Sequence, residues 1–198
     1  MIEDAEFVLK YFEAVSGGES FYGLYYLGEM YRQGFLVDKD PDEAYKYYFS
    51  IVYSTNPLRE TDDYYWRACY RKGMDLYKVG KSYSTLKAAL HDLTKAKELY
   101  DKRNPKAGPA DITKEELYQN WKKLKKKVED YLKKREELPV LAKVRCIVDD
   151  EICLTEGKVY DVLTEEHGLY GIIDDEEEDI YLYGKSYFEV VESLRLSG

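Results

Sequence analysis

The densest group of chemically active side chains in this sequence is an unbroken run of carboxylates. It comprises Asp174, Asp175, Glu176, Glu177, Glu178 and Asp179. Such a run could ligate Ca²⁺, but an EF-hand loop requires glycine at its sixth position, where this run has Asp179. We therefore expect no metal site here. Because adjacent carboxylates repel one another, the run is expected at a solvated hairpin tip, and it is also a candidate docking surface for a basic protein.

Other residues that could carry catalysis or bind a metal are few. The two histidines, His91 and His167, have no neighbouring nucleophile or metal set, and the chain lacks the common phosphate-binding, zinc-protease and nucleophile-elbow motifs. The cysteines Cys69, Cys146 and Cys153 form no CxxC pair. This spacing predicts neither a zinc site nor a disulfide framework. We therefore expect a protein that is not an enzyme and that needs no cofactor.

The charge of −9 is unevenly distributed along the chain. After Pro139 there are 15 Asp and Glu residues against 5 Lys and Arg, whereas the rest of the chain is nearly balanced. An acidic segment disfavours phosphate backbones and suits a basic protein partner. The N-terminus has no basic region followed by an apolar run, and no segment is apolar for long enough to span a membrane. We expect a cytoplasmic location and no membrane partner.

Up to about residue 138 the apolar residues recur at helical spacing. The pattern predicts helices over 4–15, 21–33, 41–54, 82–101 and 113–137. Ser20, Asp40 and Thr113 stand at N-cap positions, and Gly34 stands at a helix end. A loop with two prolines is expected over 104–111.

Residues 27–48, LGEMYRQGFLVDKDPDEAYKYY, resemble the Sel-one-like repeat, a relative of the tetratricopeptide repeat. A degenerate copy follows, since Leu76, Tyr77 and Gly80 repeat the spacing of Met30, Tyr31 and Gly34. The sequence departs from the family pattern at Leu36 and at Ile51-Val52. The resemblance implies an α-α superhelix over 1–138, with the 113–137 helix as its cap, and a role in binding other proteins.

In such repeats the partner usually lies in a groove lined by the first helix of each unit. On the 21–33 helix, Leu27, Met30 and Tyr31 are expected to face the interior. The remaining positions, spaced by three and four residues, are the groove candidates Tyr22, Tyr26, Glu29 and Gln33.

After Pro139 the apolar period changes to two, and turn residues separate five short runs typical of strands. The order KVRCIV, LTEGKVYDVL, LYGIIDD and IYLYGKSYFEVVE resembles small SH3-like barrels of bacterial and phage proteins. This resemblance implies an all-β domain over 140–198. The expected fold class is therefore α+β in two domains.

We expect a non-catalytic bacterial adaptor or scaffold that binds a protein or peptide, as a monomer or weak dimer. One alternative is a toxin-neutralising immunity protein that uses its acidic C-terminal domain against a basic partner. A second alternative is a nucleic-acid-binding regulator. It would use the lysine-rich helix segment with Lys122, Lys123, Lys125, Lys126 and Lys127, although such a cluster is more typical of a solvated helix face.

Overall fold

The computed structural model describes residues 7–8, 10–12, 14, 20–103, 112–148, 153–176 and 179–194. The chain is α+β and divides into two compact units. The helical unit comprises Met1–Lys81 and Thr85–Lys127, and the sheet unit comprises Ser82–Ser84 and Val128–Gly198. This division falls within a long helix, whereas the sequence pattern places it at Pro139.

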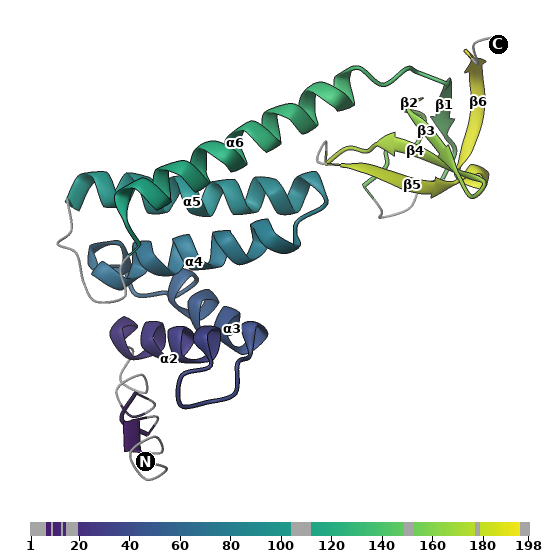
Figure 1. Cartoon of the computed structure of the whole chain (residues 1–198). Helices are drawn as coiled ribbons and strands as arrows, with labels where there is room; N and C mark the ends of the chain where they lie inside the picture. The colour runs from purple at the N-terminus through teal and green to yellow at the C-terminus, as the bar shows by residue number, and fades with distance from the viewer. Residues whose placement is uncertain are drawn as a thin grey trace. The chain divides into compact units, whose positions relative to one another are not determined.

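The helices of the described residues lie close to the predicted ranges (Figure 1). They are α2 (Phe21–Gln33), α3 (Pro41–Val52), the short 3-10 helix η1 (Arg59–Thr61), α4 (Asp63–Val79), α5 (Tyr83–Arg103) and α6 (Lys114–Glu136). In the helix predicted over 4–15, residues 7–8, 10–12 and 14 are helical, and the rest lies outside the described residues. The predicted loop at 104–111 also lies outside them.

Local capping explains where several of these helices begin and end. The Asp40 carboxylate accepts hydrogen bonds from the amides of Asp42 and Glu43, each at 3.0 Å, which confirms Asp40 as an N-cap. Thr113 Oγ1 accepts from the Glu116 amide at 3.1 Å. Gly34 ends α2 with φ +72°, a left-handed conformation that favours glycine. Ser20 occupies the N-cap position of α2 but forms no side-chain cap hydrogen bond, contrary to our expectation.

Glycines allow the helices of the helical unit to pack closely. A Cβ atom at position 28 would lie 2.6 Å from Cε1 of Tyr48, so α2 and α3 approach each other at this glycine. A Cβ atom at position 73 would lie 2.3 Å from Cδ1 of Leu93, which places the same kind of contact between α4 and α5.

Helix α6 packs on the α4–α5 pair. Its buried face includes Leu117 and Leu124, as the predicted apolar stripe requires. Trp121 Nε1 donates to Thr94 Oγ1 at 3.0 Å, and the Tyr70 hydroxyl donates to Glu116 Oε1 at 2.7 Å. These contacts fix α6 against α5 and α4 within the helical unit.

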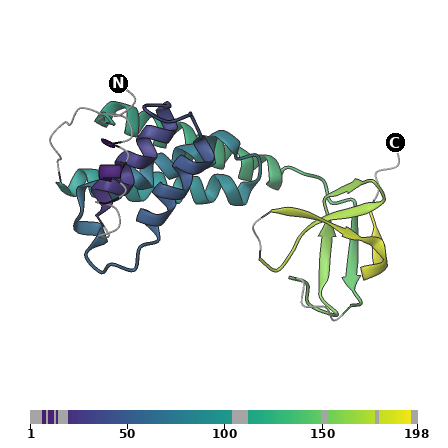
Figure 2. The ribbon, with the colours of Figure 1, turned by 90° about the horizontal axis from the view of Figure 1, so that it is seen from below.

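The sheet unit contains two antiparallel sheets of three strands each (Figures 1 and 2). One has the order β2 (Val159–Val162), β1 (Ala142–Cys146), β6 (Phe188–Ser193), and the other has the order β3 (Thr164–Glu166), β4 (Leu169–Ile173), β5 (Ile180–Gly184). The 3-10 helix η2 (Lys185–Tyr187) precedes β6. Apolar residues of both sheets, including Val144, Ile172 and Phe188, share one core.

The sequence pattern predicts five strands closed into a barrel, whereas the described residues form six strands in two separate sheets. Residues 159–166 form two strands, because the chain changes partner at Leu163. The first part pairs with β1, with Val144 opposite Tyr160, and the second part pairs with β4, with Thr164 opposite Gly171. Among the described residues, no strand of one sheet is hydrogen-bonded in a ladder to a strand of the other, so the two sheets do not close into a barrel.

A tight turn joins β3 and β4. His167 and Gly168 have φ of +51° and +78°, which is the pattern of a two-residue type I′ hairpin turn. Because Glu166 and Leu169 are register partners, the turn contains only these two residues. His167 is exposed there, as expected.

Replacing Gly28 with alanine should lower the free energy of unfolding of the helical unit by about 1–3 kcal/mol, because the added methyl group would overlap the Tyr48 ring. Both tryptophans, Trp66 and Trp121, belong to this unit, so urea unfolding followed by tryptophan fluorescence measures it. Lys123→Ala is the control, because it also places an alanine in a helix of the same unit but at an exposed position. Equal unfolding midpoints for the two variants would contradict the close approach.

Candidate functional site

The groove candidates Tyr22 and Tyr26 lie in a cluster of aromatic rings. The Tyr22 side chain is 36% exposed, and Tyr26 is half-buried. The Tyr26 ring stacks on Phe12 with centroids 5.5 Å apart, and Tyr22 meets Tyr64 edge to face at 5.3 Å. Because Phe12 and Tyr64 contact their faces, these two rings present less free surface than the helical pattern predicts. Their role as partner contacts stays a prediction.

Glu29 is not an open groove residue, which corrects the sequence-based expectation. It is 4% exposed. Its carboxylate accepts hydrogen bonds from Arg71 Nε at 2.7 Å and from the Tyr48 hydroxyl at 2.9 Å. Arg32 Nη2 donates at 2.5 Å, and Gln33 Nε2 donates at 3.0 Å. Gln33, another groove candidate, is exposed, but its side-chain amide donates a hydrogen bond to the Glu29 carboxylate.

The Glu29 carboxylate stays ionised. Burial alone would raise its pKa, but the Arg32 hydrogen bond and the charges of Arg71 and Arg32 outweigh burial and lower the pKa below the ordinary 4.5. A carboxyl group with a lowered pKa stabilises the folded state above that ordinary value, and the contribution is lost as the pH falls through the lowered pKa.

Substituting Glu29 with glutamine should destabilise the helical unit by about 2 kcal/mol at neutral pH, because two guanidinium groups lose their shared counter-charge. The difference from wild type should shrink in acid, below pH 4.5, where protonation removes the same charge from the wild-type chain. Urea unfolding followed by tryptophan fluorescence at both pH values checks this. Glu43→Gln is the control, because Glu43 of α3 is also ion-paired, with Lys46. An equal loss of stability in both variants would contradict the special role of Glu29.

The acidic run connects the paired strands β4 and β5, as the expected hairpin requires, but its first and last residues are buried and not solvated. Asp174 and Asp179 are 3% and 6% exposed. Asp174 accepts a hydrogen bond from the Tyr183 hydroxyl at 2.6 Å. Asp175 accepts from Thr155 Oγ1 at 2.7 Å and is ion-paired with Lys158.

Asp179 is a hydrogen-bond acceptor for residues of its own compact unit. It accepts from the amides of Tyr83 and Ser84, each at 3.1 Å, and from the Tyr131 hydroxyl at 2.7 Å. Of the run, Glu176 is exposed, whereas Glu177 and Glu178 lie outside the described residues. A docking surface made of all six carboxylates is therefore not present.

Replacing Asp175 with asparagine should destabilise the sheet unit by about 1 kcal/mol, because the Lys158 ion pair is half exposed and the Thr155 and Tyr160 donors remain. The Lys158 hydrogen bond lowers the pKa of Asp175 to about 2, so the effect should be full above the ordinary 3.8 and fade as the pH falls toward 2.

Amide hydrogen exchange of β1 and β4 measures the stability of the sheet unit alone. Glu166→Gln, on the exposed face of β3, is the matched control. Unchanged exchange in the Asp175 variant would show that the network adds no stability.

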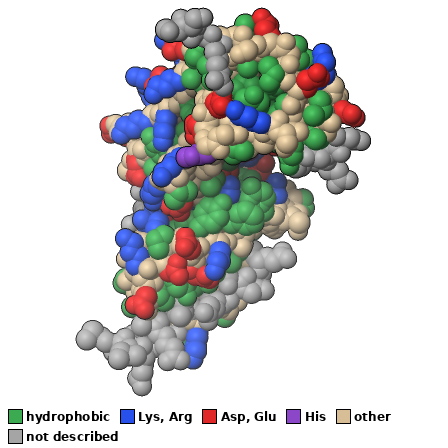
Figure 3. Space-filling model, turned by 90° about the vertical axis from the view of Figure 1, so that its right-hand side faces the viewer, with side chains coloured by type: hydrophobic (Ala, Val, Ile, Leu, Met, Phe, Trp, Pro, Cys, Tyr) green, Lys and Arg blue, Asp and Glu red, His purple; other side chains and the backbone are tan. Residues whose placement is uncertain are grey.

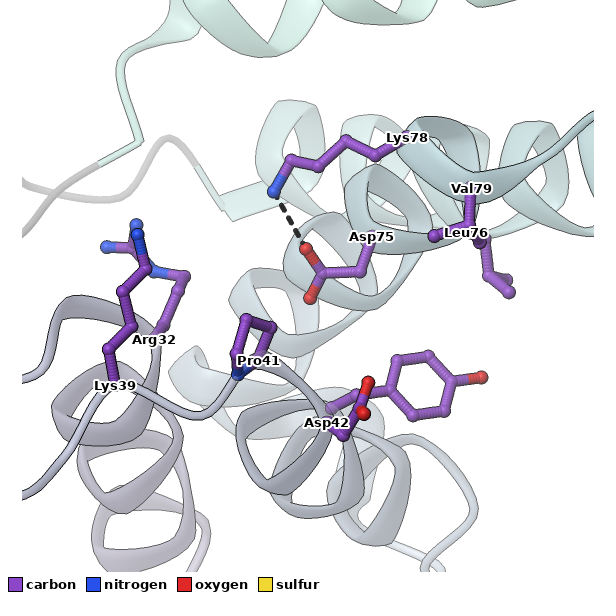
Figure 4. A pocket seen from close by; sticks show the side chains of 9 residues that line it. Arg32, Lys39, Pro41, Asp42, Asp75, Leu76, Lys78 and Val79 are labelled. Carbon is purple, nitrogen blue, oxygen red and sulfur yellow. Dashed lines mark hydrogen bonds and ion pairs between the residues drawn. The ribbon is translucent and has the colours of Figure 1, made fainter.

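The helical unit has a pocket of about 560 Å³ between α2, α3 and α4 (Figure 4). Its lining residues are Arg32, Lys39, Pro41, Asp42, Tyr45, Asp75, Leu76, Lys78 and Val79. Val79 is 71% exposed, so its side chain is open to a ligand. The lining combines apolar groups with charges of both signs.

The sequence does not predict this pocket, because its lining comes from separate segments of the chain. Its residues come from the end of α2, the α2–α3 connection, the first turn of α3 and the last turn of α4. The one available signal was the apolar Val79 between Lys78 and Gly80, at a position where a polar residue is usual.

Two other exposed surfaces are less defined as sites. Apolar side chains, among them Val159, Leu182 and Val190, are exposed on the sheet unit, and Figure 3 shows apolar side chains open to solvent on one face of the molecule. The lysines at 122, 123 and 125–127 are exposed on α6. On the sheet unit, Val159 lines a pocket of about 590 Å³ together with Lys143, Lys158 and Asp174, and Val190 lines one of about 290 Å³. The lining of the larger one is more polar than that of the α2–α3–α4 pocket.

The described residues contain neither a candidate metal site nor a helix that could span a membrane. Within the described ranges, His, Cys, Asp and Glu side chains form no group of three that could hold a metal ion. None of the helices in those ranges is both long enough and apolar enough to cross a bilayer. The three thiols are free.

Comparison of the chain with protein family models, with curated proteins and with solved structures gives no match. The function must therefore be argued from the pocket and the fold alone.

Proposed function

We propose that this protein is a non-catalytic adaptor that binds a peptide segment of another protein in the α2–α3–α4 pocket. The observation that carries the proposal is the composition of the pocket, with apolar groups of Leu76, Val79 and Pro41 beside charged groups of both signs. An apolar centre with a polar rim is the usual anatomy of a protein–protein interface. Peptide side chains could bury the exposed Val79 there.

Two features of the fold support the family resemblances behind this proposal. In the helical unit, α2–α3 and α4–α5 are successive helix pairs that each close on a glycine, as a Sel-one-like superhelix would. In the sheet unit, β1 lies between β2 and β6, and a 3-10 turn precedes the last strand, as in SH3-like domains. We propose these fold relationships together with the adaptor role and a cytoplasmic location.

The proposal moves the binding surface away from the acidic run. Asp174, Asp175 and Asp179 are engaged by internal donors, so the toxin-neutralising alternative has fewer free carboxylates than the sequence suggested. The nucleic-acid alternative still has its exposed lysines, but none of them lines the α2–α3–α4 pocket. The pocket therefore carries the favoured function.

Selection of phage-displayed random peptides on the full chain should enrich ligands that depend on the pocket. Val79→Asp should weaken their binding at least tenfold, because a carboxylate would replace an apolar group of the pocket lining. Fluorescence anisotropy with the selected peptides measures the dissociation constant.

Leu58→Asp is the matched control, because Leu58 is also an exposed apolar residue of the helical unit, at 66%, and does not line the pocket. Equal affinities for wild type and Val79→Asp would refute the proposed site. Retention of RNA instead of peptides, lost when the α6 lysines are replaced, would favour the nucleic-acid alternative.

A further inference from the structure

The charged residues that line the pocket lie in three places: Arg32 with Lys39, Asp75 with Lys78, and Asp42. Arg32 and Lys39 extend from the end of α2 and the following connection, and in Figure 4 their side chains run in the same direction. On α4, Asp75 and Lys78 form an ion pair of 2.9 Å, so they largely cancel each other. Asp42, at the start of α3, stands apart from the two cations in this view.

Among the described residues, Arg32 has one carboxylate partner and Lys39 has no ion pair. Glu29 is the only carboxylate hydrogen-bonded to Arg32 in the described part of the chain, and it also serves Arg71. One negative charge is thus shared by two guanidinium groups. Lys39 is exposed and forms no ion pair with any described residue, so its ammonium group is available to a ligand on the side of the pocket that Arg32 also lines.

The fold holds these two cations in place before any ligand arrives. Glu29 binds Arg32 through Nε at 3.1 Å and through Nη2, which fixes the plane of the guanidinium group. The Asp40 amide donates to the Tyr31 carbonyl at 2.9 Å, and the left-handed Gly34 brings the chain back beside α2. The backbone at Lys39 is therefore anchored against the helix that carries Arg32.

We infer that the pocket selects a peptide in which an aspartate or glutamate neighbours the apolar anchor, with that carboxylate placed between Arg32 and Lys39. The inference rests on the proposed function and adds the chemistry of the ligand. The apolar anchor contacts Leu76 and Val79, and the Asp42 carboxylate disfavours a second acidic residue at its own side. A strongly phosphorylated or nucleic-acid ligand is disfavoured by the same Asp42.

The test uses three short capped peptides with the same central Leu-Phe pair, preceded by Asp, by Asn or by Lys. Their affinities for the full chain are measured by fluorescence anisotropy. Wild type should bind the Asp peptide about threefold more tightly than the Asn peptide and about tenfold more tightly than the Lys peptide. In Lys39→Glu this order should reverse.

Lys81→Glu is the matched control, because it changes the net charge equally at an exposed lysine of the same unit that does not line the pocket. It should keep the wild-type order. Circular dichroism of all variants verifies that the helices remain folded.

The possible outcomes separate the inference from the function on which it rests. If Val79→Asp weakens all three peptides but Lys39→Glu leaves their order unchanged, the pocket binds peptides and the inference on acidic selectivity is wrong. If Val79→Asp changes nothing while the peptides bind, the proposed site itself is wrong. Equal affinity of the three peptides for wild type, or no binding at millimolar concentration, overturns the inference, and the phage selection then decides the function independently.

Discussion

The helical unit depends on a buried carboxylate. Glu29 projects from α2 and binds Tyr48 of α3 and Arg71 of α4, so a single side chain connects three helices. Its two further donors, Arg32 and Gln33, lie on α2 itself. Because a buried charge is costly unless it is fully hydrogen-bonded, this arrangement favours one relative placement of the helices over others. The shape of the adjacent pocket depends on that placement, because Arg32 both binds Glu29 and lines the pocket.

The sheet unit uses the same physical device with different donors. Asp174, Asp175 and Asp179 tie the segment between β4 and β5 to hydroxyl, ammonium and amide groups of other segments. Tyr183 illustrates the effect, because burial and the hydrogen bond to Asp174 both raise the pKa of its hydroxyl above the ordinary value. In both units, acidic residues that look exposed in the sequence organise the tertiary structure.

The sequence predicts well whatever is decided locally. Asp40 caps α3 through amides two and three residues away, and the turn at His167-Gly168 depends on adjacent residues. The apolar stripe of α6 likewise follows from its own spacing, as the buried Leu117 and Leu124 show. These features need no knowledge of the remainder of the chain.

What the sequence could not predict depends on distant partners. Glu29 falls on the polar side of α2 by helical spacing, and nothing near it reveals that Arg71 and Tyr48 will enclose it. The acidic run suggests mutual repulsion until Thr155, Tyr160 and Tyr183 are placed around it. The pocket is assembled from segments up to the end of α4, so no single stretch carries its signature.

The change of partner at Leu163 has a consequence for how this chain can vary. Residues 159–166 supply a strand to each sheet, and alternate side chains of a strand point to opposite faces. An insertion or deletion of one residue at Leu163 would turn β3 over while β2 kept its pairing. The number of residues from Val159 to Glu166 is therefore fixed by the pairing of both sheets, and the two-residue turn that follows is fixed by the register of Glu166 with Leu169.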